Sequence, residues 1–161
     1  MANVYVLRTP KVGDTKIKSG VATIDLHNGD FVAIGAKNKD NTYVLTAPAG
    51  TPGEIIGVVY NADVVTEGVH RGLVDDPRLL VHKKGTVVDV YFPEKGQEIA
   101  ITEVVAGTPT VGEFLIPKTG STGYEAKNAA GSGIAYKVTG EKFISIGNER
   151  VKTYEAVCVQ G

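Results

Sequence analysis

The sequence predicts an all-β protein, a small β-barrel or sandwich with little or no helix. Apolar and polar residues alternate over short runs such as 21–26, which is the pattern of a half-buried strand. The 20 glycines are spread along the chain. Turn-forming residues recur at about the 8–12-residue spacing that is typical of barrels and sandwiches. No run keeps the i, i+3, i+4, i+7 spacing of an amphipathic helix.

The first half of the chain divides into short strands separated by turns. The turns at 27–30 and 38–41 and the loop at 48–53, which is rich in Pro and Gly, set the boundaries. The run 55–60 is short, β-branched and bounded by breakers, so we predict a buried strand rather than a helix there. The strands expected in this half are 4–7, 16–18, 21–26, 31–34, 42–45 and 55–60.

The second half continues the same pattern after one ambiguous segment. Residues 66–78 fit either a strand or a short helical turn, and Pro77 biases Asp76 away from helix. Turns at 83–85 and 93–96 separate the strands that follow. The strands expected in this half are 79–81, 86–92, 98–101, 134–138, 143–146 and 154–159, with one more after Gly112-Glu113.

Two stretches of the chain are imperfect copies of one another. Asn28-Gly29-Asp30-Phe31-Val32 corresponds to Val111-Gly112-Glu113-Phe114-Leu115, with an offset of 83 in residue number between Gly29 and Gly112. The further pairs are Tyr43 with Tyr124 and Ala49-Gly50 with Ala130-Gly131, both at 81 residues, and Gly57-Val58-Val59 with Gly133-Ile134-Ala135 at 76. The smaller last offset requires a deletion in the preceding turn. The repeat therefore predicts one shape that is used twice.

The length of 161 residues fits one compact domain or a pair of small lobes. We predict that residues 1–13 form an N-terminal arm or an edge strand of the chain's own barrel. Residues 14–161 are the β-rich domain, and the repeat divides it into candidate lobes 14–64 and 96–161 joined by 65–95. If the repeat reflects a duplication, the two lobes share one strand order.

The repeated Gly-acid-Phe element has a mechanical interpretation. Glycine takes a positive φ in a tight turn without strain, and an adjacent Asp, or less readily Glu, accepts backbone N–H bonds there. The following Phe then begins a strand and points into the core. We therefore predict a turn and a core anchor in each copy. The alternative is a binding role for Asp30 and Glu113.

Charge disfavours two classes of partner. The chain has 17 basic and 18 acidic residues and a net charge of −1, whereas binding to phosphate groups requires concentrated Lys and Arg. We expect neither a nucleic-acid nor a membrane partner. No run is long enough to span a membrane and the first residues lack a secretory hydrophobic region, so we expect synthesis in the cytoplasm without export.

The sequence offers little catalytic or metal-binding chemistry. His27, His70 and His82 have no metal-ligand spacing, although His70 and His82 flank Asp75 and Asp76 and would form a His-carboxylate cluster if they converged. We expect solvated turn residues instead.

The remaining candidates are equally weak. Cys158 lies in a predicted terminal strand, where a small buried hydrophobe is expected over a nucleophile or an intersubunit bridge. The loop 118–123 lacks the Walker spacing of a phosphate cradle, and no Gly-x-Ser-x-Gly elbow is present. We therefore predict no catalytic, cofactor or metal site, and a protein that is not an enzyme.

The chain resembles the capsid decoration proteins of tailed bacteriophages, also called cement or head-stabilising proteins. The similar features are the turns Gly29-Asp30-Phe31-Val32 and Gly112-Glu113-Phe114-Leu115, the phrase Gly53-Glu54-Ile55-Ile56-Gly57-Val58-Val59, and the strand Lys84-Gly85-Thr86-Val87-Val88. The resemblance implies a non-enzymatic structural protein on the virion exterior. Such a protein binds the major capsid protein in the assembled shell, often as a trimer, and needs no cofactor.

Two other classes remain open. A carbohydrate- or receptor-binding β-domain of a virion or cell surface should carry clustered exposed aromatics, and the chain has no Trp, 7 Tyr and 4 Phe. A small β-barrel enzyme would need a converging polar pocket. For a structural protein, an exposed edge strand would pair with a neighbour, and residues 1–12 are the candidate arm.

Overall fold

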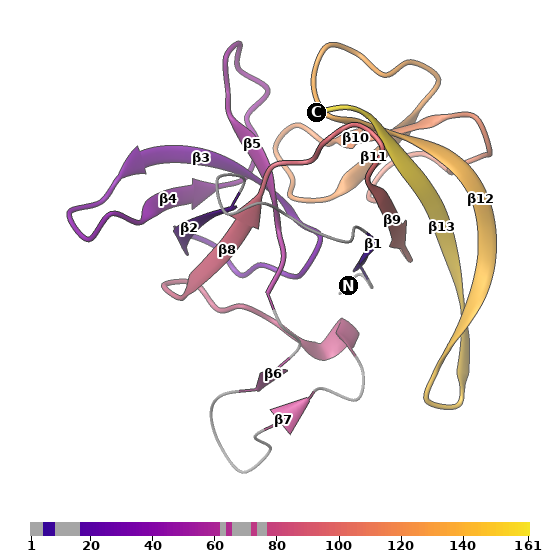
Figure 1. Ribbon diagram of the computed structural model, residues 1–161, viewed down its shortest axis with the longest axis horizontal. Coiled ribbons are helices and arrows are strands. Elements are labelled where there is room, and N and C mark those ends of the chain that lie inside the picture. Colours follow the sequence, from indigo (N-terminus) through magenta and orange to yellow (C-terminus); the bar gives the residue numbers. More distant parts are fainter. Residues whose placement is uncertain (1–4, 9–16, 62–63, 66–71, 74–76) are drawn as a thin grey trace.

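The computed structural model describes residues 5–8, 17–61, 64–65, 72–73 and 77–161. The protein is all-β, as predicted, and its described helix is a single 3-10 turn, η2 (Pro77–Leu79). Residues 79–81, expected as a strand, therefore begin in this turn. Two β-units lie side by side in Figure 1. A small two-stranded ribbon, β6 (Val64–Val65) with β7 (Gly72–Leu73), lies apart from both.

The first unit is a closed five-stranded barrel. Its order is β2-β4-β3-β5-β8, and the parallel pair β2–β4 closes the barrel, whose other neighbouring strands are all antiparallel. The strands are β2 (Ile17–Ala22), β3 (Phe31–Lys37), β4 (Tyr43–Thr46), β5 (Ile56–Val59) and β8 (Val87–Tyr91).

The second unit is a six-stranded sheet in the order β1-β9-β13-β12-β10-β11. Its strands are β1 (Tyr5–Arg8), β9 (Glu98–Ile101), β10 (Phe114–Pro117), β11 (Tyr124–Lys127), β12 (Ala135–Ile146) and β13 (Glu149–Gln160). β1 pairs antiparallel with β9 at the edge of this sheet. Of the two interpretations of residues 1–13, the described part is an edge strand, and the rest lies outside the described residues.

The two units have the same strand order. Read from β2, the barrel runs β2-β8-β5-β3-β4. The second unit, apart from its additional edge strand β1, runs β9-β13-β12-β10-β11. With β1 left aside, each order begins with the earliest strand in the sequence and continues with the last. The parallel seam also has a counterpart, because Ala106, just after β9, forms a parallel bridge with Glu125 in β11. The common strand order predicted from the repeat is present.

The boundaries of the repeat differ from the predicted ones. The first barrel extends past residues 14–64, because β8 lies inside the segment 65–95 that was expected only to join the lobes. Without β8, strands β2 and β5 would each expose an unpaired edge. The last predicted pair is also shifted. Val32 pairs with Gly57 and Leu115 pairs with Tyr136, so Gly57 corresponds to Tyr136, at an offset of 79, rather than to Gly133.

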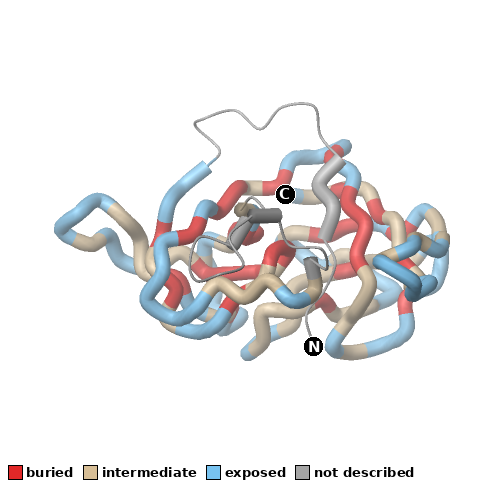
Figure 2. Tube along the Cα trace, turned by 90° about the horizontal axis from the view of Figure 1, so that it is seen from below, coloured by how far each residue is buried: buried red, intermediate tan, exposed pale blue. Residues whose placement is uncertain are grey.

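Two apolar clusters form the core of the described residues. The first lies inside the barrel and includes Val32, Val59 and Val90. Successive strand residues point to opposite faces, so their neighbours Phe31, Val58 and Tyr91 lie on the outside of the barrel. These three residues are nevertheless buried, because they belong to a second cluster with the apolar side chains of β9–β13. Figure 2 shows buried segments throughout both units. The outer face of the barrel is thus part of the core that joins the units.

A ring contact and two hydrogen bonds also connect the barrel to the second unit. The ring centroids of Phe31 and Tyr124 are 4.5 Å apart, and the Tyr124 hydroxyl donates to the Gly29 carbonyl at 2.8 Å. The amide of Phe31 donates to the Thr122 carbonyl at 2.8 Å. The contact therefore joins the first Gly-acid-Phe turn to the loop before β11.

Candidate functional site

The Gly-acid-Phe turns have the same geometry in both copies. In the first, Asp30 N donates to His27 O at 3.2 Å and His27 N donates to Asp30 Oδ2 at 2.8 Å. In the second, Glu113 N donates to Thr110 O at 3.1 Å and Thr110 N donates to Glu113 Oε2 at 3.0 Å. Gly29 and Gly112 have φ of 91° and 97°. The predicted turn role of Asp30 and Glu113 is confirmed.

The aromatic residue after the turn behaves differently in the two copies. Phe31 is fully buried between the units, whereas Phe114 is only half-buried. The prediction of a core anchor in the second copy is therefore wrong, and Leu115 fills the interior position there. The reason is that both Phe side chains lie on the outer face of their unit, and only the first outer face is covered by the other unit.

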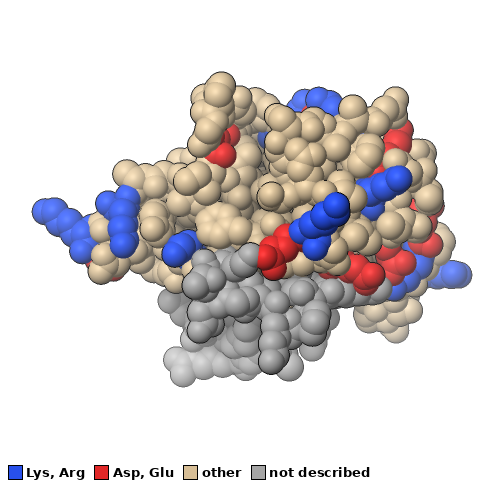
Figure 3. Space-filling view, turned by 45° about the horizontal axis from the view of Figure 1, so that its top comes forward, with Lys and Arg blue, Asp and Glu red and all other residues tan. Residues whose placement is uncertain are grey.

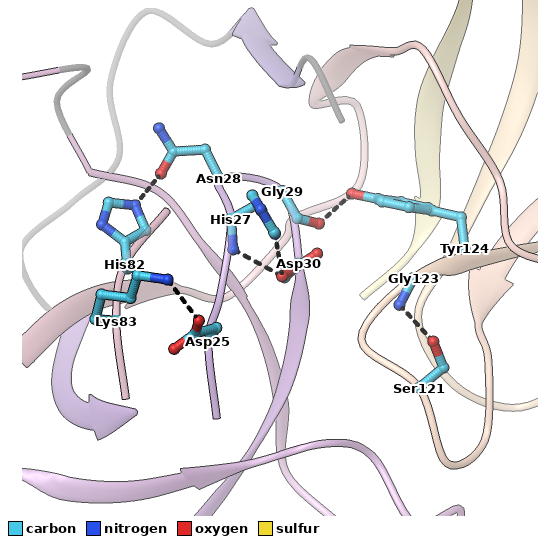
Figure 4. A network of polar contacts seen from close by, with 10 residues as sticks. All are labelled: Asp25, His27, Asn28, Gly29, Asp30, His82, Lys83, Ser121, Gly123 and Tyr124. Atoms are coloured by element: carbon cyan, nitrogen blue, oxygen red, sulfur yellow. Dashed lines mark hydrogen bonds and ion pairs between the residues drawn. The ribbon is translucent and has the colours of Figure 1, made fainter. Parts of the chain in front are cut away.

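A hydrogen-bonded network surrounds the first turn (Figure 4). The buried Asn28 accepts from Asn61 N at 2.9 Å through Oδ1 and donates to Asn61 O at 2.9 Å through Nδ2. His82 Nε2 lies 3.0 Å from the same Oδ1, so this ring nitrogen carries the hydrogen. Asn61 Oδ1 in turn accepts from Asp89 N at 2.8 Å. The network holds the turn against β8 and the segment before it.

His27 and His82, which were considered as metal ligands, contact different residues. His27 Nδ1 lies 3.7 Å from Asp30 Oδ2, while His82 faces Asn28. His70, Asp75 and Asp76 lie outside the described residues, so the expectation that they are solvated turn residues rather than a His-carboxylate cluster stays a prediction. Within residues 17–61 and 77–161 no group of three His, Cys, Asp or Glu side chains is arranged to hold a metal ion.

Two carboxylates are paired with lysines at the surface. The Lys83 ammonium, 2.9 Å from Asp25, and the Lys84 amide hold the pKa of the Asp25 carboxyl below its usual value. Lys127, at 3.1 Å, and Lys118, at 3.2 Å, lower the pKa of Glu125.

The loop 118–123 is an internal contact of the protein. Gly120 N donates to Pro48 O at 2.7 Å, across the two units. Gly123 N donates to Ser121 Oγ at 3.2 Å within the loop itself. These amides are therefore engaged in holding the units and the turn together.

Cys158 is buried in β13, at 1% exposure. Burial raises the pKa of its thiol, so the reactive thiolate is disfavoured at neutral pH. Its Sγ is 3.5 Å from the Gln160 carbonyl. The expectation of a small buried hydrophobe is confirmed.

The long hairpin β12–β13 extends beyond the sheet (Figure 1). β10 pairs with β12 only at Tyr136 and Lys137, and β9 pairs with β13 only over residues 154–157. We call residues 139–153 the projecting ribbon. In the described part of the chain, neither of its edges pairs with a further strand. The prediction had divided this ribbon into separate strands. The available signal was Gly147-Asn148, a two-residue turn between alternating runs.

One face of the ribbon carries an exposed aromatic residue. Phe143 is 54% exposed, and the Arg150 guanidinium lies 4.6 Å from its ring centroid. Lys152 Nζ lies 5.0 Å from the Tyr154 ring and 2.6 Å from Glu141. The other face carries the half-buried aliphatic residues Ile144, Ile146 and Val151.

A shallow polar hollow lies beside the base of the ribbon. It measures about 60 Å³ and is lined by Glu98, Ile99, Thr139, Glu155, Ala156 and Val157. Sites for small-molecule ligands are several times larger and mostly apolar, about 300–1,000 Å³. This hollow therefore does not provide a substrate site.

Comparisons with known proteins add no relative. No family model matches the sequence, and neither a curated protein nor a solved structure matches the chain. Among the described residues, no helix is long and apolar enough to cross a membrane.

Proposed function

We propose that this chain is a non-enzymatic structural protein that binds the outer surface of an assembled phage capsid and stabilises it. The supporting observation is a duplicated β-unit joined through one apolar core, with a ribbon that projects from it. A module of this kind loses little conformational entropy when it docks. Many copies spread over the joints between shell subunits multiply a modest contact by avidity.

The side-chain chemistry is consistent with a structural role. Asp30 and Glu113 close their own turns, Asn28 and His82 brace the first turn, and Cys158 is buried. These side chains are used for folding rather than presented in a pocket. The protein thus offers rigid surfaces and strand edges, which suit a protein partner.

The proposed partner is the major capsid protein, on the exterior of the virion. A homo-oligomer, with a trimer favoured, would place several modules around one position of the shell. In Figure 3, acidic and basic side chains lie near one another on the right of the face, and much of the rest of the face is uncharged. Such a mixture suits a protein partner better than nucleic acid or an anionic membrane, which require concentrated positive charge.

Cosedimentation with shells tests this function. The chain is mixed with assembled shells of the phage that carries it, freed of this chain, and separately with their unassembled major capsid protein. We expect it to pellet with shells alone and to raise the temperature at which they disrupt. An unrelated small β-barrel of similar net charge serves as the control. Absence from the shell pellet, or equal binding to unassembled subunits, contradicts the proposal.

The alternative is a carbohydrate- or receptor-binding domain. The exposed aromatic residue of the ribbon, Phe143, would be its natural stacking platform for a sugar. Arg150 already lies over this ring, which favours a protein contact instead. Binding of the chain to a panel of immobilised glycans, lost in F143A, would support this alternative over the shell.

A further inference from the structure

We propose that the projecting ribbon is the part of the chain that docks on the shell, through its Phe143–Arg150 face, against a surface that presents carboxylates. This inference rests on the proposed function and specifies its contact. It follows from the strand register, from the charges on one face of the ribbon and from the exposure of Phe143.

The register places Phe143 and two of the ribbon's three basic side chains, Arg150 and Lys152, on one face, whereas Lys142 lies on the other. Phe143 is paired with Lys152, and Ser145 is paired with Arg150. Directly opposite residues of an antiparallel pair share a face, as do residues two apart on one strand. The docking face therefore consists of Glu141, Phe143, Ser145, Arg150 and Lys152, and it continues onto the partly buried Tyr154 where the ribbon joins the sheet.

The docking face has one charge without a counter-charge in the described structure. Lys152 is neutralised by Glu141 at 2.6 Å. Arg150, in contrast, stacks on Phe143 and forms no ion pair with any described carboxylate. A guanidinium offers five N–H donors in one plane, a geometry that matches a carboxylate at two points. The excess positive charge selects an acidic partner.

The composition and mechanics of the face also suit an interface. Aromatic and Arg side chains dominate the energetically important positions of protein contacts. The stacking of Arg150 on Phe143 holds both side chains in place before binding, which reduces the entropy lost on docking.

The test compares variants of the docking face with a matched control from the first barrel. R150E and F143S alter the face, and R150K keeps the charge but removes the two-point geometry. K37E is the control, since the exposed Lys37 has its Nζ 5.7 Å from the ring of the half-buried Tyr43 and the charge change equals that of R150E. Thermal unfolding of each variant verifies the fold, and R150Q replaces R150E if the latter unfolds early.

Affinity is measured by cosedimentation with assembled shells at low and high salt. We expect R150E and F143S to bind at least about tenfold more weakly, as for central interface residues, with R150K between them and the wild type. K37E should change affinity by less than about twofold, because isolated surface charges contribute little. The salt dependence of binding should fall in R150E.

The outcomes separate this inference from the function it rests on. If the wild type binds shells and R150E and F143S bind equally well, the ribbon is not the contact and the function stands. If K37E loses as much affinity as R150E, general charge attraction explains the binding and the ribbon assignment fails. If the wild type does not bind shells, both proposals fall.

Discussion

The two β-units are built on one strand order but are closed to different extents. The barrel has three residue pairs along its parallel seam, whereas the second unit has the single bridge Ala106–Glu125. At the barrel seam, a Cβ added to Gly20 would lie 2.5 Å from the Leu45 side chain. The register places Ile101 at the equivalent position of the second unit. A small inner residue lets two strands approach, and a large one keeps them apart.

The outer faces of the units differ as well. Phe31, Val58 and Tyr91 form the apolar outer face of the barrel, which is buried against the second unit. The register gives Phe114, Lys137 and Val157 as the equivalent residues, and Lys137 is exposed. The outer face that is buried against the other unit is therefore apolar, and the outer face that includes the exposed Lys137 is partly polar. The repeated turn fixes where the strands lie, and the neighbour determines which of their faces become core.

The largest predicted effect concerns the two Phe residues. We expect F31A to lower the free energy of unfolding by about 3–5 kcal/mol, because it removes a fully buried ring and leaves a cavity. F114A should cost only about 1 kcal/mol, because the half-buried ring gains less from folding. Urea unfolding monitored by circular dichroism measures both. Equal losses of unfolding free energy would show that Phe114 contributes as much to the core as Phe31.

A second prediction concerns the tight approach at the barrel seam. G20A should destabilise the protein by about 1–3 kcal/mol, because the added methyl group overlaps the buried Leu45. G133A is the control, since its Cβ would meet nothing within 4 Å, and it should be neutral or stabilising by up to about 1 kcal/mol. The double variant G20A/L45V should lose less than the sum of its two single changes. Full additivity would contradict the overlap.

Hydrogen exchange distinguishes the two seams. The amide of Ala126 donates to Ala106 O at 2.9 Å across the single bridge of the second unit. We expect this amide to exchange at least about tenfold faster than the buried β4 amides of the barrel, because a seam of one bridge opens locally at lower free energy. Comparable protection at the two seams would show that the second unit is closed as firmly as the first.

The smallest predicted effect is on the stability of the protein in acid. Asp25 near the barrel and Glu125 in the second unit have pKa values lowered by Lys83 and by Lys127 with Lys118, respectively. A lowered folded-state pKa adds stability that is present above the unfolded pKa and is lost as pH falls through the folded pKa. D25N and E125Q should therefore each slightly flatten the decline of the unfolding midpoint below about pH 4. Because Asp25 is exposed and Glu125 is paired with two lysines that are themselves exposed, an effect as large as that of F31A would contradict this assignment.

Local features were predictable from sequence for a clear reason. Glycine followed by Asp or Glu marks a turn whose hydrogen bonds are made within four residues, so Gly29-Asp30 and Gly112-Glu113 were located correctly. The repeat of such turns also predicted a common strand order. The pairing of Gly57 with Gly133 was wrong, because strand register follows backbone pairing rather than residue identity.

Contacts between distant segments were not predictable in the same way. β8 completes the barrel although it lies in the segment that was expected to be a linker. Its place follows from the free edges of β2 and β5, which only the folded barrel brings to either side of it. The projecting ribbon was missed because β12 and β13 are partly polar over its length and pair there with no further strand that the structure describes. Its arginine and phenylalanine become a candidate interface only through cross-strand pairing.

The sequence by itself determined that the chain is all-β, where its glycine turns lie and that one strand order occurs twice, because these depend on backbone preferences and short-range alternation. The tertiary structure decided that Phe31 is core and Phe114 is not, that one unit closes fully, and that a ribbon projects from the other. These outcomes depend on which surfaces meet, and burial is a property of the pair of surfaces rather than of either residue alone.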